Sequence, residues 1–171
     1  PAKARKPDVV LRGVGEIAAS IERAGVDINA WTSYDQTVYH VVVPKLLFET
    51  GLDVLADALQ RSAFDREELA RELEVILEEI KRSEDQPTTK VSRALFEATF
   101  AKHHYRRPVI GFADVVRAVT RDDVLHFFDA HYRAERMTAV IVGDVDPQEA
   151  TKAVAAAFAG ARSAFPGVQS T

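Results

Sequence analysis

Apolar residues recur with two different periods along this chain, and each period predicts a different kind of element. Between Val26 and Val43, β-branched and aromatic residues flank the turn-forming residues Ser33–Gln36, which predicts two antiparallel strands joined by a tight turn. Helical spacing predicts helices at residues 13–24, 46–59, 65–82, 91–102, 122–131 and 148–159. The apolar segment Met137–Val142 predicts a further strand that is buried on both faces.

Capping residues mark where two of these helices begin. Asp65 is expected to be an N-cap, with Glu68 at the capping-box position. Thr120 is also expected to be an N-cap, with Asp123 at the capping-box position. The polar segment Ser83–Thr89 is expected to separate two helices. Strands early, helices in the middle and a strand near the end predict an α+β fold, in which helices cover an antiparallel-containing sheet.

Composition narrows the range of partners. The formal net charge of −4 provides no basic surface for nucleic acid, and no apolar run reaches the roughly 20 residues of a membrane span. The absence of cysteine excludes disulfides and thiolate metal sites, and the sequence does not distinguish a bacterial periplasmic from a cytoplasmic location. Residues 1–11 are basic and contain proline, so we expect a disordered tail or a non-native remnant there, and a single domain over residues 12–171.

The helix predicted at residues 65–82 is strongly acidic, and helical geometry separates its carboxylates into groups. Its glutamates are Glu67, Glu68, Glu72, Glu74, Glu78 and Glu79. Glu72 and Glu79 fall within roughly 20° of each other at the border of the apolar face, whereas Glu74 and Glu78 point to the opposite side. A solvated face is the ordinary explanation for any one of them. Two stacked carboxylates beside a buried face, however, need a hydrogen-bonding, ionic or metal partner.

The histidines do not have the spacing of a self-contained metal site. They are His40, His103, His104, His126 and His131, and no pair has the H-x-x-x-H spacing that places two imidazoles on one helical face. We therefore expect surface or hydrogen-bonded histidines. The sequence also lacks a G-x-S-x-G motif and a phosphate-binding glycine loop, so it supports neither acyl-enzyme chemistry nor nucleotide binding.

Four stretches together resemble the pitrilysin (insulinase) family of zinc metallopeptidases, particularly its mitochondrial-processing-peptidase-like branch. They are GEIAASIERAGVDINAWTSYDQTVYHVVV (Gly15–Val43), FDREELARELEVILEEIKRSEDQP (Phe64–Pro87), YRRPVIG (Tyr105–Gly111) and LHFFDAHYRAERMTAVIVGDVDP (Leu125–Pro147). The most specific combination is N-A-x-T, followed by a T-x-Y strand and then by R-E and a further glutamate. The resemblance implies that the fold is one half-unit of such a peptidase.

In that family, two histidines of an H-x-x-E-H helix and a downstream glutamate bind zinc, and the motif glutamate is the general base. The resemblance implies that Glu79 is the downstream zinc ligand and that Glu72 orients a histidine ligand. It places no catalytic residue in this chain, because the general base belongs to the H-x-x-E-H segment. Pro1–Leu11 stands where that segment is expected and contains no histidine, so we expect the amino-terminal part of the domain to be missing.

The resemblance also assigns a substrate-binding edge strand to Asn29, Ala30, Trp31 and Thr32. Such a strand recognises the main chain of an extended peptide, and the small Ala30 side chain leaves room for it. The alternative is that Asn29 and Ala30 simply begin a strand.

These features predict a half-unit of a zinc endopeptidase that cleaves peptides or unfolded proteins with a metal-activated water. A second homologous half or subunit is the implied partner. The alternative is a non-catalytic half that binds peptide or acts as a scaffold for an active partner. A helical interaction module would leave the N-A-x-T strand and the paired glutamates unexplained.

Overall fold

The computed structural model describes residues 27–161, in which the sheet is a two-stranded antiparallel hairpin. β1 spans Asp27–Thr32 and β2 spans Thr37–Val42. Ser33 N–H donates to the Gln36 carbonyl oxygen at 2.8 Å and closes the turn. The predicted hairpin is therefore confirmed. The tail predicted at residues 1–11 and the helix predicted at 13–24 lie outside the described residues.

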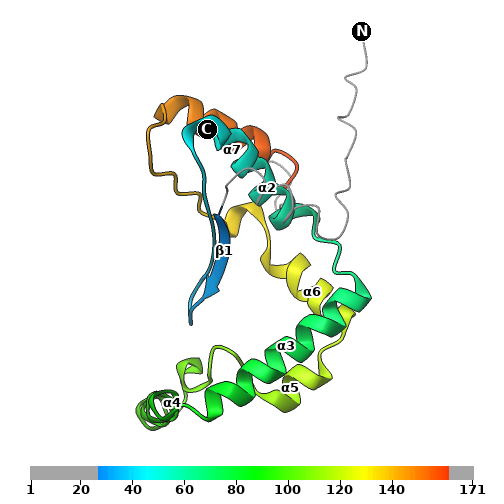
Figure 1. The fold of residues 1–171 in the computed structure, drawn as a ribbon, viewed down its shortest axis with the longest axis vertical. Coiled ribbons are helices and arrows are strands. Elements are labelled where there is room, and N and C mark those ends of the chain that lie inside the picture. Colours follow the sequence, from blue (N-terminus) through cyan, green and yellow to red (C-terminus); the bar gives the residue numbers. More distant parts are fainter. Residues whose placement is uncertain (1–26, 162–171) are drawn as a thin grey trace.

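Helices follow the hairpin along the chain (Figure 1). The α-helices are α2 (Phe48–Arg61), α3 (Arg66–Glu84), α4 (Pro87–Thr99), α5 (Ala113–Ala118), α6 (Arg121–His131) and α7 (Pro147–Ala157). Single-turn 3-10 helices are η1 (Lys45–Leu47), η2 (His104–Arg106) and η3 (Ala134–Arg136). α2 contacts α7, and α3 contacts both α4 and α5, so the helices form two groups toward opposite ends of the hairpin. This arrangement agrees with the predicted α+β class. No helix in the described chain is long and apolar enough to cross a membrane.

α2 packs on one face of the hairpin and contributes the most completely buried of the larger side chains. Val54 is 2% exposed, and Ile28, Val41 and Val43 of the hairpin region pack against it. The helix approaches the strand so closely at Gly51 that an added Cβ would lie 2.9 Å from Val43 Cγ1. A glycine at this position therefore permits the close contact between α2 and the hairpin.

α3 begins at the predicted N-cap. Asp65 Oδ1 accepts hydrogen bonds from the N–H groups of Glu67 at 2.9 Å and Glu68 at 3.1 Å. These bonds hold the pKa of Asp65 below its ordinary value, the bond from Glu68 having the largest effect. The Glu68 carboxylate pairs with Arg71 at 2.6 Å, so Asp65 caps the helix as predicted while Glu68 is used in an ion pair rather than in a capping box.

α4 begins earlier than the sequence indicated. The break predicted over Ser83–Thr89 is limited to Asp85 and Gln86, and Pro87 is the first residue of α4. Proline is tolerated there because its φ suits a helix and its missing N–H would have no intrahelical partner. The predicted extent of 91–102 for this helix was therefore wrong at both ends.

Aromatic contacts hold the hairpin turn against the end of α4. The Tyr34 ring stacks on Phe96 with centroids 5.2 Å apart, and its centroid lies 4.7 Å from that of Tyr105. The Tyr105 hydroxyl donates to Asp35 Oδ2 at 2.5 Å. These contacts fix the position of the turn relative to α4 and η2.

α6 begins with the capping box that the sequence predicted. The Asp123 N–H donates to Thr120 Oγ1 at 3.2 Å, and the Thr120 N–H donates to Asp123 Oδ2 at 2.9 Å. Arg121 Nε donates to the carbonyl oxygen of Phe64 at 2.6 Å, which ties the first turn of α6 to the α2–α3 connection. Phe128 is 4% exposed and packs edge-on against the Phe64 ring.

The strand predicted at Met137–Val142 is wrong. This segment belongs to no sheet in the described chain, and Val140 and Val142 are 79% and 92% exposed. Its apolar composition predicted burial between neighbouring strands, but burial of that kind requires a paired strand on at least one side. None of residues 27–161 supplies such a strand.

Candidate functional site

The backbone of β1 alternates between bonding to β2 and facing an open edge. Ser33 and Gln36 form a hydrogen-bonded pair at the turn. Hydrogen-bonded pairs alternate along an antiparallel ladder, so Asp27, Asn29 and Trp31 are the residues of β1 that bond to β2.

The outward-facing backbone groups of β1 therefore belong to Ile28, Ala30 and Thr32. The Ala30 N–H agrees with this assignment, because it donates to Oδ1 of the neighbouring Asn29 side chain at 2.8 Å. All four residues of the predicted substrate strand, Asn29–Thr32, are exposed, and Trp31 is 48% exposed. The strand thus presents an open edge in the described chain. At the centre of this edge, the Ala30 N–H donates to the Asn29 side chain.

The two carboxylates singled out from the sequence lie on α3, at the border of its buried face. Ile80 is buried on that face, with Leu73 and Ile76 half-buried, whereas Glu72 and Glu79 are exposed. The hairpin turn packs on α4 and α4 packs on α3, so α4 connects the strand to the acidic helix.

Ion pairs distinguish the glutamates of α3. Glu68 Oε1 lies 2.6 Å from Arg71 Nη2, and Glu78 Oε1 lies 3.9 Å from Lys81 Nζ. Within residues 27–161, the side chains of Glu72 and Glu79 form neither an ion pair nor a hydrogen bond. The same is true of Glu67, Glu74 and Glu84, so the position of Glu72 and Glu79 at the border of the buried face, and not the lack of a partner, is what distinguishes these two carboxylates.

The described part of the chain does not bring a complete metal site together. No group of three or more His, Asp or Glu side chains within residues 27–161 is arranged to hold a metal ion. The rings of His103 and His104 lie 4.2 Å apart, and His103 Nδ1 accepts from the Tyr105 N–H at 3.4 Å. His131 Nδ1 lies 3.0 Å from Arg136 Nη1. These three histidines thus have stacking or hydrogen-bonding partners, as expected from the sequence.

Two tyrosines that the sequence analysis passed over have altered acidities. The Tyr39 hydroxyl lies 2.6 Å from the Tyr132 hydroxyl. Partial burial raises the pKa of Tyr39, and the hydrogen bond to Tyr132 raises it further. The hydrogen bond to Asp35 raises the pKa of Tyr105 above its ordinary value. Both phenols therefore remain protonated near neutral pH and act as hydrogen-bonding links.

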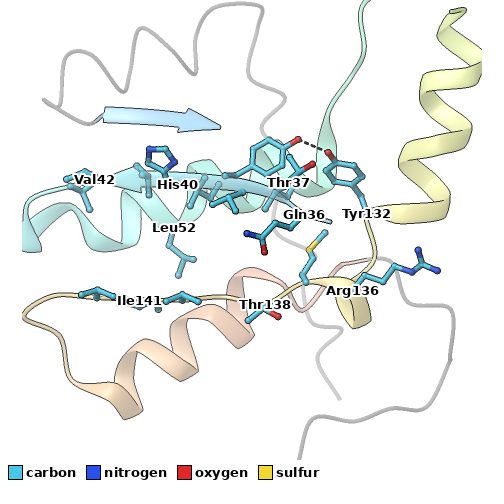
Figure 2. Close-up of a pocket in the computed structure, with 18 of the residues that line it drawn as sticks. Gln36, Thr37, His40, Val42, Leu52, Tyr132, Arg136, Thr138 and Ile141 are labelled. Atoms are coloured by element: carbon cyan, nitrogen blue, oxygen red, sulfur yellow. Dashed lines mark hydrogen bonds between the residues drawn. The ribbon is translucent and has the colours of Figure 1, made fainter. Parts of the chain in front are cut away.

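A cavity that the sequence analysis did not predict lies beside β2 (Figure 2). Its volume is about 1260 Å³. β2 forms one wall, the segment Thr138–Val142 forms the opposite wall, and Leu52 of α2 lies between them. The signal in the sequence was the apolar segment Met137–Val142, which we interpreted as a paired strand.

Nearly the whole chain matches known protein families. Residues 12–112 match the family described as insulinase (peptidase family M16), and residues 118–165 match the one described as the peptidase M16 inactive domain. The chain belongs to the insulinase family. The resemblance found in the sequence is therefore confirmed.

Curated relatives are longer than this chain. One from Rickettsia bellii (strain RML369-C), named as an uncharacterized zinc protease, is 33% identical over 141 residues, which cover 82% of this chain and 34% of the relative. A probable mitochondrial-processing peptidase subunit beta from Arabidopsis thaliana is 35% identical over 147 residues, which cover 86% of this chain and 28% of the relative. The insulinase-family chain thus spans about a third of the length of these relatives.

Solved structures share the fold. A protease from Helicobacter pylori has a TM-score of 0.83 at 24% identity, covering 92% of this chain and 38% of that chain. The first half of the periplasmic protease PqqL from Escherichia coli has a TM-score of 0.77 at 26% identity, covering 90% of this chain and 35% of that chain. The predicted half-unit fold of an M16 peptidase is confirmed by these likenesses.

Proposed function

We propose that this chain is part of a zinc-dependent endopeptidase, in which residues 12–171 form one half-unit without its amino-terminal part. Family membership and relatives named as zinc proteases support the proposal. The observation that carries it is the place of Glu79 on α3, where it is exposed beside the buried Ile80 and has no ionic partner among the described residues. That position is the one to which the family resemblance assigns a zinc ligand.

The described residues fit only one part of a zinc site. Catalytic zinc in peptidases takes three protein ligands and leaves one position for water. Residues 27–161 contain no group of three candidate ligands, so we propose Glu79 as one ligand and expect the others from elsewhere in the full-length protein. Glu72 lies on the same side of α3 and is proposed to orient a histidine ligand. The general base is likewise expected outside this chain.

The substrate class we propose is an extended peptide or an unfolded protein segment. The open edge of β1 offers the backbone groups of Ile28, Ala30 and Thr32, which recognise a main chain rather than a particular sequence. An incoming peptide would replace Asn29 Oδ1 as the acceptor for the Ala30 N–H. This exchange makes one hydrogen bond as another is lost, so the free edge costs the unbound protein little.

A second candidate function is a non-catalytic half that binds peptide or supports an active partner. The match of residues 118–165 to the peptidase M16 inactive domain favours it. The presence of both Glu72 and Glu79 favours the catalytic alternative, because a scaffold does not need an unpaired carboxylate at the ligand position. Both functions imply a second homologous half or subunit.

Substitution of Glu79 in the full-length protein tests the proposal. Glu79→Gln keeps the size of the side chain but removes the anionic oxygen that zinc requires, so bound zinc and peptidase activity should both be lost while the fold survives. Glu72→Gln should be milder and reduce metal affinity or activity by about 10- to 100-fold. The measurements are cleavage of an unstructured peptide and zinc content per protein chain.

Glu78→Gln is the matched control. Glu78 directly precedes Glu79, but its carboxylate lies 3.9 Å from Lys81 Nζ. This variant should therefore keep zinc and activity. Equal damage from Glu78→Gln and Glu79→Gln would show that α3 presents a different face to the site. An active parent that keeps its zinc in Glu79→Gln would refute the assignment of the ligand. A folded full-length protein with neither zinc nor activity would favour the non-catalytic half.

A further inference from the structure

The connection between α2 and α3 has a strained backbone at Phe64. Its φ is 47°, and no other residue except glycine has a positive φ within residues 27–161. A side chain is crowded against the backbone in this left-handed region, so a bulky residue stays there only where its surroundings hold it. The contacts of Phe64 therefore determine the direction in which the chain leaves α2 and enters α3.

Arg121, the first residue of α6, holds this connection by its backbone. Its Nε donates to the Phe64 carbonyl oxygen at 2.6 Å, and its Nη2 donates to the Ala63 carbonyl oxygen at 3.0 Å. The guanidinium group is planar and presents its donors in a fixed geometry, so the two bonds fix the orientation of two consecutive carbonyl groups. The Phe64 ring also packs edge-on against Phe128 of α6, with centroids 5.0 Å apart. Both the backbone and the side chain of Phe64 are thus held by α6.

α6 is joined to the hairpin at its other end (Figure 1). The Phe128 ring stacks on Tyr132 with centroids 4.6 Å apart, and the Tyr132 hydroxyl lies 2.6 Å from that of Tyr39 on β2. A continuous series of contacts therefore runs from β2 through α6 to the start of α3. The far end of α3 is tied separately, because the next helix, α4, carries Phe96, which stacks on Tyr34 in the hairpin turn. α3 is thus fixed relative to the hairpin near each of its ends.

We infer that Arg121 is a positioning residue for the peptidase reaction, because it fixes the start of α3 and so the place of the proposed ligand Glu79 relative to β1. The inference rests on the proposed function. Without Arg121, Phe64 is free to return to a negative φ, which changes the direction of α3. Reaction rates are sensitive to such changes, since a displacement of about 1 Å can lower a rate about 100-fold. Arg121 thus acts on the zinc site through α3 rather than by contact with metal or substrate.

Arg121→Gln in the full-length protein tests the inference. Zinc affinity should fall about 10- to 100-fold, and kcat at saturating zinc should fall by a similar factor, because Glu79 is displaced. KM for an unstructured peptide should stay within about twofold of the parent, since β1 pairs with β2 and not with α3 or α6. Arg117→Gln is the matched control. It removes the same charge from an exposed arginine that forms no hydrogen bond or ion pair within residues 27–161, so it should behave like the parent.

A distance measurement tests the placement of α3 without relying on activity. Spin labels on cysteines introduced at Glu49 of α2 and Glu74 of α3, both exposed, report the separation of the two helices by pulsed electron paramagnetic resonance. The distribution of distances should be narrow in the parent and in Arg117→Gln, and it should broaden or shift in folded Arg121→Gln. A shifted distribution in a protein whose parent has neither zinc nor activity would support the placement of α3 by Arg121 and refute the proposed function.

Two outcomes would overturn the inference. A folded variant that is only less stable, with the distance distribution, zinc affinity and kcat of the parent, would show that Arg121 stabilises the fold without positioning the site. A rise in KM with zinc affinity and kcat unchanged would show that the substrate strand is affected instead of α3. If Arg121→Gln does not fold, Arg121→Lys takes its place and is judged by the same outcomes, because lysine keeps the charge but offers a point donor in place of the planar fork.

Discussion

The hydroxyl oxygens of Tyr39 and Tyr132 lie 2.6 Å apart, although 93 residues separate them in the chain. Their rings also meet edge-on, with centroids 6.2 Å apart, so the pair joins the middle of β2 to the end of α6. A second phenol, Tyr105, joins the hairpin turn to η2 through Asp35. The hairpin carrying the candidate substrate edge is therefore held at its turn and along its length by tyrosine hydroxyls.

Tyr39→Phe should lower the free energy of unfolding by about 1 kcal/mol near neutral pH, since it removes one hydrogen bond between side chains. It should also change the response to alkali. Because the pKa of Tyr39 is raised in the fold, its contribution to stability is complete below about pH 10 and is lost as the pH rises above that value. Urea unfolding at increasing pH should therefore show a steeper loss of stability for the unsubstituted protein than for Tyr39→Phe.

Tyr34→Phe is the control for this prediction. The Tyr34 ring stacks on Phe96, and its hydroxyl forms no hydrogen bond within residues 27–161. Its loss should leave both the stability and its alkaline slope within about 0.5 kcal/mol of the parent. Equal effects of Tyr34→Phe and Tyr39→Phe would contradict the assigned role of the Tyr39–Tyr132 pair.

Gly51→Ala should destabilise the protein by about 1 kcal/mol, even though alanine is the better helix former. The propensity gain is about 1 kcal/mol in a helix interior, whereas forcing a methyl group into a close-packed contact costs about 1–3 kcal/mol. The new Cβ would lie 2.9 Å from Val43 Cγ1 and 3.4 Å from Val43 Cγ2, and a β-branched side chain has little freedom to move aside. Chemical denaturation would measure the change.

A double-mutant cycle identifies the cause of that loss. Val43→Ala removes the methyl groups that an alanine at position 51 would strike, so the two changes together should cost less than the sum of their separate effects. Gly160→Ala is a control, since the nearest atom to its added Cβ is Gln60 Oε1 at 3.9 Å. Additive effects of Gly51→Ala and Val43→Ala would show that the contact does not limit the packing of α2.

The sequence correctly predicted the elements that are held together by residues close to one another along the chain. The hairpin followed from the turn residues Ser33–Gln36, and α6 followed from the reciprocal cap of Thr120 and Asp123. The segment Met137–Val142 failed because its apolar pattern specifies burial but not the partner strand. A strand exists only when paired, so composition alone cannot show whether its partner lies in the same chain.

For the candidate site, too, the sequence predicted local positions but not the contacts between side chains. Helical periodicity placed Glu72 and Glu79 at the border of the buried face of α3, and the structure agrees. Periodicity could not show that Glu68 and Glu78 have cationic neighbours while those two do not, because ion pairing depends on side-chain rotamers. The Tyr39–Tyr132 link was equally invisible, since no local pattern relates residues so far apart in sequence.

Ala30→Pro in the full-length protein should weaken peptide binding at the β1 edge without unfolding the hairpin. The Ala30 N–H does not bond to β2, so its removal leaves the ladder intact, and proline is tolerated where a strand N–H faces outward. A peptide on this edge would lose one hydrogen bond of about 0.5–1.5 kcal/mol. We expect KM for an unstructured peptide to rise about 2- to 10-fold while kcat changes little.

Ala30→Ser separates loss of the donor from a change of side chain. It keeps the N–H and adds only a small hydroxyl at an exposed position, so KM should stay close to that of the parent. A rise in KM for Ala30→Ser equal to that for Ala30→Pro would indicate that the side chain, not the backbone, governs binding. An unchanged KM for Ala30→Pro in a folded, active protein would show that the peptide binds elsewhere. Asn29–Thr32 would then have only a structural role, as one strand of the hairpin. Circular dichroism of both variants checks that the comparison is made between folded proteins.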